Sequence, residues 1–473
     1  SAAVTPREAA DRFAAGGSQM LERQLAKAEE EFIAGRLDAV ADICGEMIAA
    51  DPQCHQAYYL LGRTCVTLEK SEQALELIAR AAEIAPDAAP YHTELGNVLA
   101  MEEQFEEAAD AYRRATELAP DFIDPHVNLG AVLQLLGRYA EAVEIYRKSA
   151  ELAPEAAMLV FNMAEAQRAM GQGEASLDAY RQAVTLEPGW AVLHAKLGEA
   201  LADHGDPAEA VECCRRAVGL APEEADHHIA LARALLSAGE ARSALSTCDA
   251  YMASHPYHSG LVACRALLLN ETGSRPAAER LLGLEGLVQC VDVAVPTAFG
   301  TIEAFNGALS EEVELRFEPE YDPDRQVTRN GKQSTSLFFR PGPGVALLME
   351  RIDEAVRAYI GDLPDDPNHP LIGHLPDRWR LSGWSVTLEP HGFQFAHIGV
   401  EGWLGGLYAV EAGDGIVEFG APPENWAYSV APPLKSFEPA NGQLMLFPSY
   451  VYRRLPATGG TRCYIAFEIV AEG

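Results

Sequence analysis

Seven prolines recur along the first part of the chain at a constant interval of 34 residues, at positions 52, 86, 120, 154, 188, 222 and 256. A small residue returns at the same interval, at Gly62, Gly96, Gly130, Ala164, Gly198, Ala232 and Ala266. A second small residue follows twelve positions later each time, at Ala74, Ala108, Ala142, Ser176, Ala210, Ala244 and Ala278. Such a period is typical of arrays in which like units stack and each unit packs only on its neighbours. The spacing predicts an array over roughly the first 290 residues.

Each unit has the pattern of two helices, as residues 91–104 and 105–119 illustrate. Pro120 ends the second of them because proline has no N–H to donate, and the recurring small residues let the two helices approach closely. With the pattern LG…A…P in most units, the array resembles the tetratricopeptide repeat family. The resemblance implies an N-terminal extension at 1–18 and a right-handed all-α solenoid of about eight helix pairs at 19–288.

The first helices of such repeats line a concave groove in which partners bind, so we expect a protein or peptide partner there. Asn128 and Asn162 occupy equivalent positions in successive repeats, and Asn97 is a third candidate one repeat earlier. Side-chain amides there can hydrogen-bond an extended peptide backbone of any sequence. The equivalent positions elsewhere are Leu60, Glu94, Lys196 and Ala230, so ordinary surface polarity remains the alternative.

Pairs of histidines and cysteines in the array raise the question of a metal site. The pairs are His227 with His228, His255 with His258, and Cys213 with Cys214. Adjacent residues on a helix point about 100° apart, and the second histidine pair straddles a repeat proline in a turn. The spacing therefore favours structural roles.

After about residue 285 the helical period fades, and we expect a second domain at 289–473. Helices are predicted at 301–317 and 343–360, with turns between them around 322–335. From residue 380 the chain breaks into short apolar runs separated by glycine or proline, at 380–390, 392–400, 405–413, 415–422, 443–450 and 462–470. This pattern predicts an α+β domain built on a jelly roll, a double-stranded β-helix.

The order of these segments resembles the 2-oxoglutarate-dependent Fe(II) oxygenases related to prolyl hydroxylases. The matching pieces are Phe305-Asn306 with Leu309, Asn330-GKQST, His369-Pro370, Gly383-Trp384-SVTL, Gly392-Phe393-Gln394, His397, Gly402-Trp403-Leu404 with Gly406 and Tyr408, Gly442-QLMLFPSY and Arg462-CYIAFEI. They cover the whole C-terminal domain. The resemblance implies a ligand site inside the barrel.

The metal positions of that family are degenerate here. His397 matches the first histidine of its HxD or HxH pair, but Gly399 stands where the second member belongs and Arg453 follows FPSYVY where the distal histidine belongs. A related halogenase subgroup carries glycine or alanine at the second position. A guanidinium, however, has no lone pair for a metal. Rescue of the site would need His391 with a carboxylate such as Glu401 or Glu418. We therefore expect no Fe(II), with His397 a vestigial ligand.

Arg462 matches the basic residue that grips the 5-carboxylate of 2-oxoglutarate in this family. With Tyr408, Trp384 and Arg453 it forms the predicted cofactor-binding set. We expect no cofactor or, failing that, 2-oxoglutarate or another dicarboxylate. Arg453 and Arg462 are predicted to form a cationic pocket for a carboxylate of a ligand, a peptide terminus or a side chain such as Glu418. The alternative for Arg453 is a solvent-facing residue on a rim strand.

Charge and composition exclude some functions. A net charge of −34 opposes binding to nucleic acid or to anionic membranes, although part of it is the solvated charge of helix faces. No apolar run is long enough to span a bilayer, and the start has no signal-like segment, so a cytoplasmic location is expected. The nine cysteines contain no CxxC pair, and we expect reduced thiols.

Three functions remain. In the first, the chain is a scaffold or adaptor whose solenoid binds a partner and whose oxygenase-like domain is a pseudo-oxygenase. In the second, it is a protein-modifying dioxygenase with an atypical metal site. In the third, the barrel senses an anionic metabolite. The missing ligands favour the scaffold, and the oligomeric state stays open.

Overall fold

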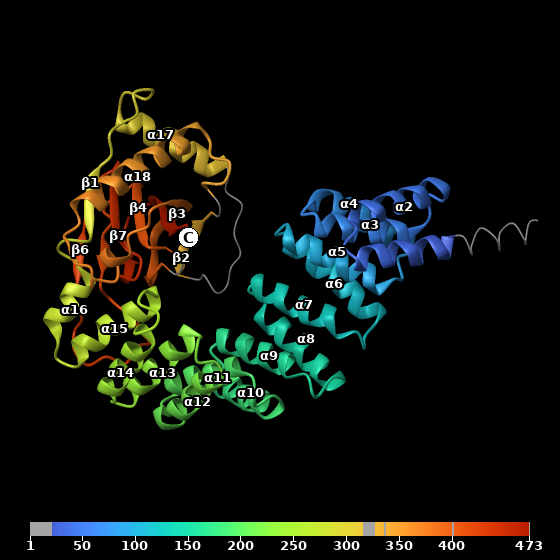
Figure 1. Ribbon diagram of the computed structural model, residues 1–473, viewed down its shortest axis with the longest axis horizontal. Coiled ribbons are helices and arrows are strands. Elements are labelled where there is room, and N and C mark those ends of the chain that lie inside the picture. The colour runs from blue at the N-terminus through green and yellow to red at the C-terminus, as the bar shows by residue number, and fades with distance from the viewer. Residues whose placement is uncertain (1–20, 316–326, 335–336, 400–401, 473) are drawn as a thin grey trace, which may run out of the picture. The chain divides into compact units, whose positions relative to one another are not determined.

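The computed structural model describes residues 21–315, 327–334, 337–399 and 402–472 (Figure 1). The chain forms two compact units, residues 1–179 and residues 180–473, called unit 1 and unit 2 below. The division falls inside helix α10 (Gly173–Leu186), well before the predicted domain boundary at 288. Among the described residues, no helix combines the length and hydrophobicity that a membrane crossing needs.

The repeats form antiparallel helix pairs close to the predicted positions. Unit 1 contains a helical segment at 21–33 and then α2 (Leu37–Ala50), α3 (His55–Thr67), α4 (Ser71–Ile84), α5 (Ala89–Met101), α6 (Phe105–Leu118), α7 (Ile123–Leu135), α8 (Tyr139–Leu152), α9 (Ala157–Ala169) and the start of α10. Unit 2 continues with α11 (Ala191–His204), α12 (Pro207–Leu220), α13 (Ala225–Ser237), α14 (Ala241–Met252), α15 (Ser259–Glu271) and α16 (Arg275–Leu282). In the described part of the chain these make eight pairs, as predicted.

The recurring small residues explain how the helices of a pair fit together. A side chain of the second helix lies over the first small position, and a Cβ added at Gly96 would lie 2.6 Å from the Tyr112 ring. Gly130 meets Tyr146 in the same way, with even less room. The second set of small residues, from Ala74 to Ala278, is fully buried throughout. The periodic glycines and alanines therefore set the helix spacing, as predicted.

The histidines of the array support the helix junctions. His126 and His194 each bond through Nε2 to the carbonyl of the repeat proline six residues earlier, both at 3.0 Å. His228 does the same with Pro222 at 2.9 Å. His258 accepts the N–H of Leu261 at the start of α15. These roles satisfy polar groups at helix ends, as the sequence analysis favoured.

The C-terminal part of unit 2 is rich in strands, and nine described strands form one hydrogen-bonded sheet. The strands are β1 (Gln289–Asp292), β2 (Thr328–Gln333), β3 (Trp379–His397), β4 (Leu404–Glu411), β5 (Val417–Phe419), β6 (Lys435–Phe437), β7 (Gln443–Pro448), β8 (Arg453–Leu455) and β9 (Arg462–Ala471). The order of pairing is β1-β7-β4-β9-β3-β8-β5-β6, and β2 pairs with β3. β2 lies where the sequence predicted only turns.

One long strand, β3, connects the two parts of this arrangement. Residues 379–388 pair with β9, whereas Gln394 and His397 pair with Leu455 and Arg453 of β8. His391 has a φ of 67° and interrupts the extended backbone between the two halves. The two strands predicted at 380–390 and 392–400 are therefore one strand that bends between them.

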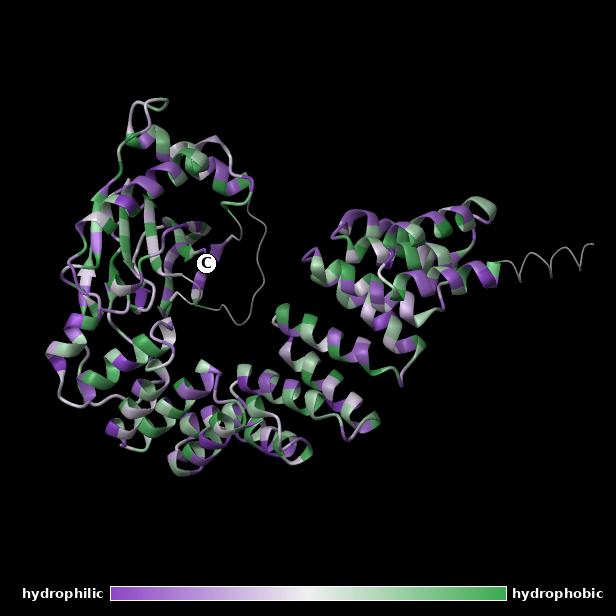
Figure 2. Ribbon diagram, viewed as in Figure 1, coloured by the Kyte–Doolittle hydropathy of each residue, from purple (hydrophilic) through white to green (hydrophobic). Residues whose placement is uncertain are grey.

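Helices α17 (Ile302–Leu315) and α18 (Pro343–Asp362) match the predicted helices, apart from residues 316–317, which lie outside the described part. Phe305 and Leu309 of α17 are fully buried, and so are Val345 and Ile352 of α18. All four belong to a core shared with β4, β7 and β9, whose strands are largely hydrophobic (Figure 2). The two helices therefore cover one face of these strands.

The last repeats are joined to the β-rich region by specific hydrogen bonds within unit 2. The Tyr257 hydroxyl, in the turn before α15, donates to the carbonyls of Gly402 and Trp403, both at 3.2 Å. The Glu271 carboxylate accepts both the N–H and the hydroxyl of Ser429. These hydrogen bonds help to explain why unit 2 includes the last repeats as well as the strands.

Candidate functional site

A hollow of about 520 Å³ lies on the first helices of the repeats in unit 1. Helices α3, α5 and α7 line it together with Met158 of α9 and Phe122. Its lining residues are Tyr59, Pro90, Thr93, Glu94, Asn97, Phe122, Ile123, Asp124, Val127, Asn128 and Met158. The hollow therefore mixes amides, carboxylates, aromatic rings and aliphatic side chains.

Two of the three predicted asparagines meet in this hollow. Asn128 donates through Nδ2 to Oδ1 of Asn97 at 3.0 Å, and the Tyr112 hydroxyl donates to the same oxygen at 2.8 Å. Asn97 in turn donates to the Glu94 carboxylate at 3.0 Å. Asn162 does not line the hollow, and its amide lies beside the Tyr146 hydroxyl instead. The structure thus links Asn97 and Asn128 across two repeats.

The second candidate site lies on the face of β9 that points away from α17. Side chains alternate along a strand, so Arg462, Tyr464 and Glu468 share one face. Trp384, which pairs with Ala466, lies on this face as well. Tyr408 does not.

Tyr408 pairs with Ile465 and therefore belongs to the opposite face of β9. Its hydroxyl donates to Oδ1 of Asn306 in α17 at 2.6 Å. The predicted cofactor-binding set is thus divided between the two faces of the sheet. The reason is the strand alternation, because Tyr408 aligns with an odd-numbered residue of β9.

Arg453 is buried directly across from His397. The two residues are register partners in β8 and β3, and Arg453 is only 2% exposed, so its alternative placement as a solvent-facing rim residue is wrong. Its guanidinium lies 5.1 Å from the centre of the Phe447 ring, and within the described ranges Nε and Nη1 have no hydrogen-bond partner. Burial lowers the pKa of Arg453 to about 10, against the opposing effect of Glu468. A guanidinium with this pKa stays cationic at neutral pH.

His397 is half-buried and neutral. Burial and the neighbouring charge of Arg453 lower the pKa of His397 to about 3, although its Nδ1 lies 2.8 Å from the carbonyl of Phe395. A carbonyl oxygen can only accept, so Nδ1 carries the hydrogen. Nε2 is then the nitrogen with the free lone pair.

Glu468 fills the space beside Gly399. A Cβ added at Gly399 would lie 2.5 Å from Oε1 of Glu468 and 3.1 Å from Cβ of Ser449. Gly399 is also fixed by its backbone, which donates to the carbonyl of Ser449 at 2.8 Å. The carboxylate near Arg453 is therefore Glu468. Glu418, the predicted candidate, pairs with Arg454 at 2.5 Å instead.

Arg462 is fully buried and only partly satisfied. Its Nη2 donates to the carbonyl of Gly392 at 2.7 Å and its guanidinium lies beside the Tyr464 hydroxyl, while Nε and Nη1 have no well-formed hydrogen bond among the described residues. Burial lowers the pKa of Arg462 and raises the pKa of the neighbouring Tyr464 to about 12. Arg462 contacts β3 at Gly392, whereas Arg453 is the register partner of His397, five residues further along the same strand. A ligand that touched both would extend along β3.

These residues do not fit an iron site of the facial-triad type. Such a site needs two imidazoles and a carboxylate on one ion, and the residue across from His397 is a buried cation without a lone pair. Within the described ranges, no group of three His, Cys, Asp or Glu side chains is arranged to hold a metal. His391 is exposed at the bend of β3, and Glu401 lies outside the described residues. The rescue combinations therefore find no support in the geometry.

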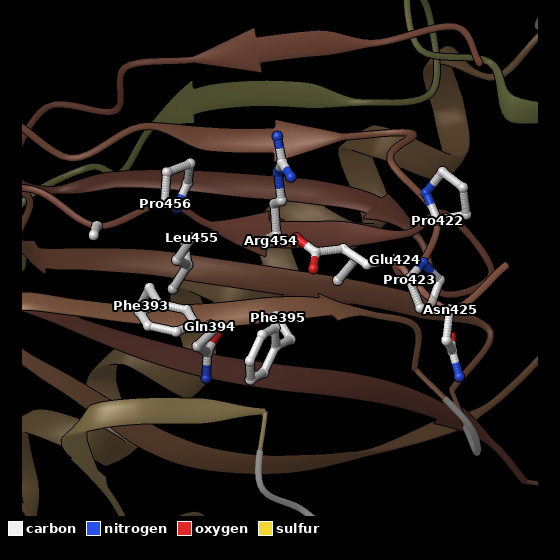
Figure 3. Close-up of a pocket in the computed structure, with 12 residues that line it drawn as sticks. Phe393, Gln394, Phe395, Pro422, Pro423, Glu424, Asn425, Arg454, Leu455 and Pro456 are labelled. Atoms are coloured by element: carbon white, nitrogen blue, oxygen red, sulfur yellow. The ribbon is translucent and has the colours of Figure 1, made fainter. Parts of the chain in front are cut away.

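A second hollow, of about 450 Å³, lies between the second half of β3, β8 and the loop at 422–425 (Figure 3). Phe393 and Phe395 form one wall, with ring centres 5.0 Å apart, and Pro422 and Pro423 form another. Arg454 also lines it, but this guanidinium is already paired with Glu418. The hollow is a mixed apolar surface whose one lining arginine is neutralised.

Sequence reasoning missed Glu94, Asp124 and Glu468. Glu94 stands one repeat before Asn128 at the equivalent position, which was a usable signal. Glu468 is the single acid of β9, whose only other charged residue is Arg462 at its start, and a charge in a buried strand requires a partner. Its position beside Gly399, however, depends on a contact between segments far apart in the chain.

Comparisons with known proteins identify the repeats. Residues 31–95, 96–137, 123–156 and 195–259 match family models of the tetratricopeptide repeat. No curated protein sequence matches the chain. The chain therefore contains an all-α array of tetratricopeptide repeats followed by a β-rich region.

Several solved structures match parts of this chain. YrrB, described as a TPR protein with an unusual peptide-binding site, is 21% identical over 39% of this chain and 95% of its own, with a TM-score of 0.35. MamA from Desulfovibrio magneticus is 21% identical over 36% of this chain and 96% of its own, with a TM-score of 0.34. PilF from Pseudomonas aeruginosa is 18% identical over 45% of this chain and 96% of its own, with a TM-score of 0.39.

Proposed function

We propose that this protein is an interaction scaffold whose repeats hold an extended segment of a partner protein in the hollow of unit 1. The observation that carries the proposal is the bonded pair of Asn97 and Asn128 among the lining residues. Oδ1 of Asn97 accepts hydrogen bonds from Tyr112 and Asn128, which fixes the orientation of the Asn97 and Asn128 amides. The Oδ1 of Asn128 takes part in neither bond and is left to accept from a backbone N–H of the segment.

A display library of random peptides, selected on the full chain, tests this function. We expect enriched peptides whose binding is lost in Val127→Arg, because a long charged side chain then fills the hollow. Glu107→Arg is the matched control, since Glu107 is exposed on α6 and does not line the hollow. Failure to enrich any peptide, or equal loss in both variants, would contradict the proposed function.

The β-rich region is a jelly roll of the oxygenase type in this proposal. Its support is the strand order, in which β7, β4, β9 and the first half of β3 form one run and the second half of β3, β8, β5 and β6 form the other. The bend of β3 carries the chain from one run to the other. In this proposal the region carries a buried cation, Arg453, near Glu468 where the family holds its metal, and it is a pseudo-oxygenase. Iron-dependent hydroxylation of a bound protein does not fit these residues.

A second candidate function is the sensing of a dicarboxylate. It is favoured by the buried guanidinium of Arg462, whose Nε and Nη1 have no well-formed hydrogen bond among the described residues and could donate to a carboxylate. Calorimetry with 2-oxoglutarate and with succinate, both in the presence of EDTA, tests it. Binding lost in Arg462→Ala, with the circular dichroism spectrum retained, supports the sensor. No heat of binding from either dicarboxylate to the wild-type chain contradicts it.

A further inference from the structure

We infer that the segment bound in the hollow of unit 1 carries a lysine or arginine side chain flanked by apolar residues. This inference rests on the proposed function and adds the chemistry of the partner. It follows from the charges and the apolar surfaces that line the hollow.

Two carboxylates without a cationic partner line the hollow. Glu94 lies near the middle of α5 and is half-buried, and Asp124 is exposed in the first turn of α7. Neither forms an ion pair with any described residue, although many acids elsewhere in the repeats do, such as Asp110 with Arg113. Interaction with the helix dipole accounts for an acid in a first turn, as at Asp124, but not for Glu94. The position of Glu94 therefore asks for another explanation.

The charge of Glu94 is felt by the two tyrosines around it. It helps burial to raise the pKa of Tyr59, and this effect exceeds the opposite effect of Arg63. It also contributes to the raised pKa of Tyr112, which burial brings to about 12. The guanidinium of Arg63 lies 4.8 Å from the centre of the Phe32 ring and 5.7 Å from the centre of the Tyr59 ring. Arg63 therefore covers Tyr59 rather than the Glu94 carboxylate, whose negative charge still favours a bound cation in the hollow.

The rest of the lining suits the stem of a long basic side chain. Ile123, Val127 and Met158 provide aliphatic surface. Met158 is 45% exposed, so its side chain is accessible to a bound segment. Lysine and arginine bury their methylene stems on such surface and keep the charged end near polar groups. A neighbouring apolar residue of the segment would cover Phe122.

Charge complementarity selects this occupant over the alternatives. An acidic segment would bring its charge beside Glu94 and Asp124 in a chain that already carries a net charge of −34. A purely apolar segment would leave the half-buried Glu94 with less water and no cation in return. A segment with a basic side chain and flanking apolar residues matches both the carboxylates and the apolar surface of the hollow.

Sequencing of the peptides enriched on the full chain tests the inference. We expect lysine or arginine next to an apolar residue in most binders, and affinity that falls about tenfold in the double variant Glu94→Gln, Asp124→Asn. Raising the salt from 50 to 300 mM should weaken the wild-type complex more than that of the double variant. Glu107→Gln on α6 is the matched control and should leave affinity unchanged.

The outcomes separate the two levels of the argument. Enriched peptides that are acidic or uncharged, or that bind the double variant as well as the wild type, overturn this inference and leave the scaffold function standing. No enrichment at all overturns the scaffold function itself. Circular dichroism of the double variant checks that its repeats stay folded.

Discussion

The repeats and the β-rich region satisfy their buried polar groups in different ways. In the repeats, a histidine such as His126 bonds to the carbonyl of a proline six residues away, so the partner comes with the same local sequence. In the β-rich region, the buried Arg462 donates instead to the carbonyl of Gly392, which lies 70 residues away in the chain. Neither region pairs every buried polar atom, because Nδ1 of His126 and Nε of Arg453 both have no hydrogen-bond partner among the described residues. A partner within the same repeat recurs with the period, whereas a partner from a distant segment depends on strand register.

The two regions also use glycine differently. In the repeats, Gly96 and Gly130 recur with the period and make room for an aromatic ring of the paired helix. In the β-rich region, Gly399 makes room for a single carboxylate that arrives from β9. Substitutions at the two kinds of glycine therefore test whether helix packing or charge dominates in each region.

The largest effect is expected from Gly130→Ala. The new Cβ would collide with the ring of Tyr146, which is fully buried and has no space to move, so α7 and α8 should lose roughly 2 to 3 kcal/mol. Amide hydrogen exchange in these helices measures the loss. Gly45→Ala in α2, where nothing lies within 4 Å of the added Cβ, should be neutral or slightly stabilising. Equal effects of the two variants would break the comparison.

Gly399→Asp should destabilise the β-rich region by about 2 kcal/mol. The substitution puts a second carboxylate next to Glu468 and also crowds its side chain. Adding Glu468→Gln should restore part of the loss, because the like charge is removed while the crowding remains. Denaturant unfolding followed by tryptophan fluorescence reports it. Gly459→Asp, at an exposed glycine with nothing within 4 Å, is the control.

The smallest effect concerns pH. The folded pKa of His397 is about 3, below the unfolded value of roughly 6.5, so acid protonates the unfolded chain first. Stability from this residue is present above about pH 6.5 and is lost as the pH falls toward 3. His397→Gln should reduce the loss between pH 7 and pH 5 by about 1 to 2 kcal/mol, a discounted value because the ring keeps some contact with solvent. Identical pH profiles for the two proteins would contradict the placement of His397 beside a cation.

The sequence predicted the repeats better than the site in the β-rich region, for a physical reason. Prolines and small residues repeat with the period, so each helix pair is specified within 34 residues. The strands were also visible as apolar runs, and α18 (Pro343–Asp362) as a buried stripe. What could not be predicted depends on register, as when Tyr408 aligns with Ile465 and so faces α17.

The arginine positions illustrate the same limit. The charges of Arg453 and Arg462 suggested one cationic pocket; both side chains are buried, but they contact β3 five residues apart. Glu418 seemed a suitable carboxylate from the sequence, yet it lies across from Arg454, one residue out of phase with Arg453. A shift of one residue moves a side chain to the other face of a strand, and sequence alone does not fix that shift.

Titration of the full chain with Mn(II), a redox-stable stand-in for Fe(II), tests most directly the claim that a guanidinium stands where a metal ligand would. The account predicts no stoichiometric binding by the wild-type chain, and weak binding gained in Arg453→His, where two imidazoles and the Glu468 carboxylate would surround one point. That gain should vanish when His397→Ala is added. One Mn(II) bound tightly by the wild-type chain and lost in His397→Ala would contradict the account.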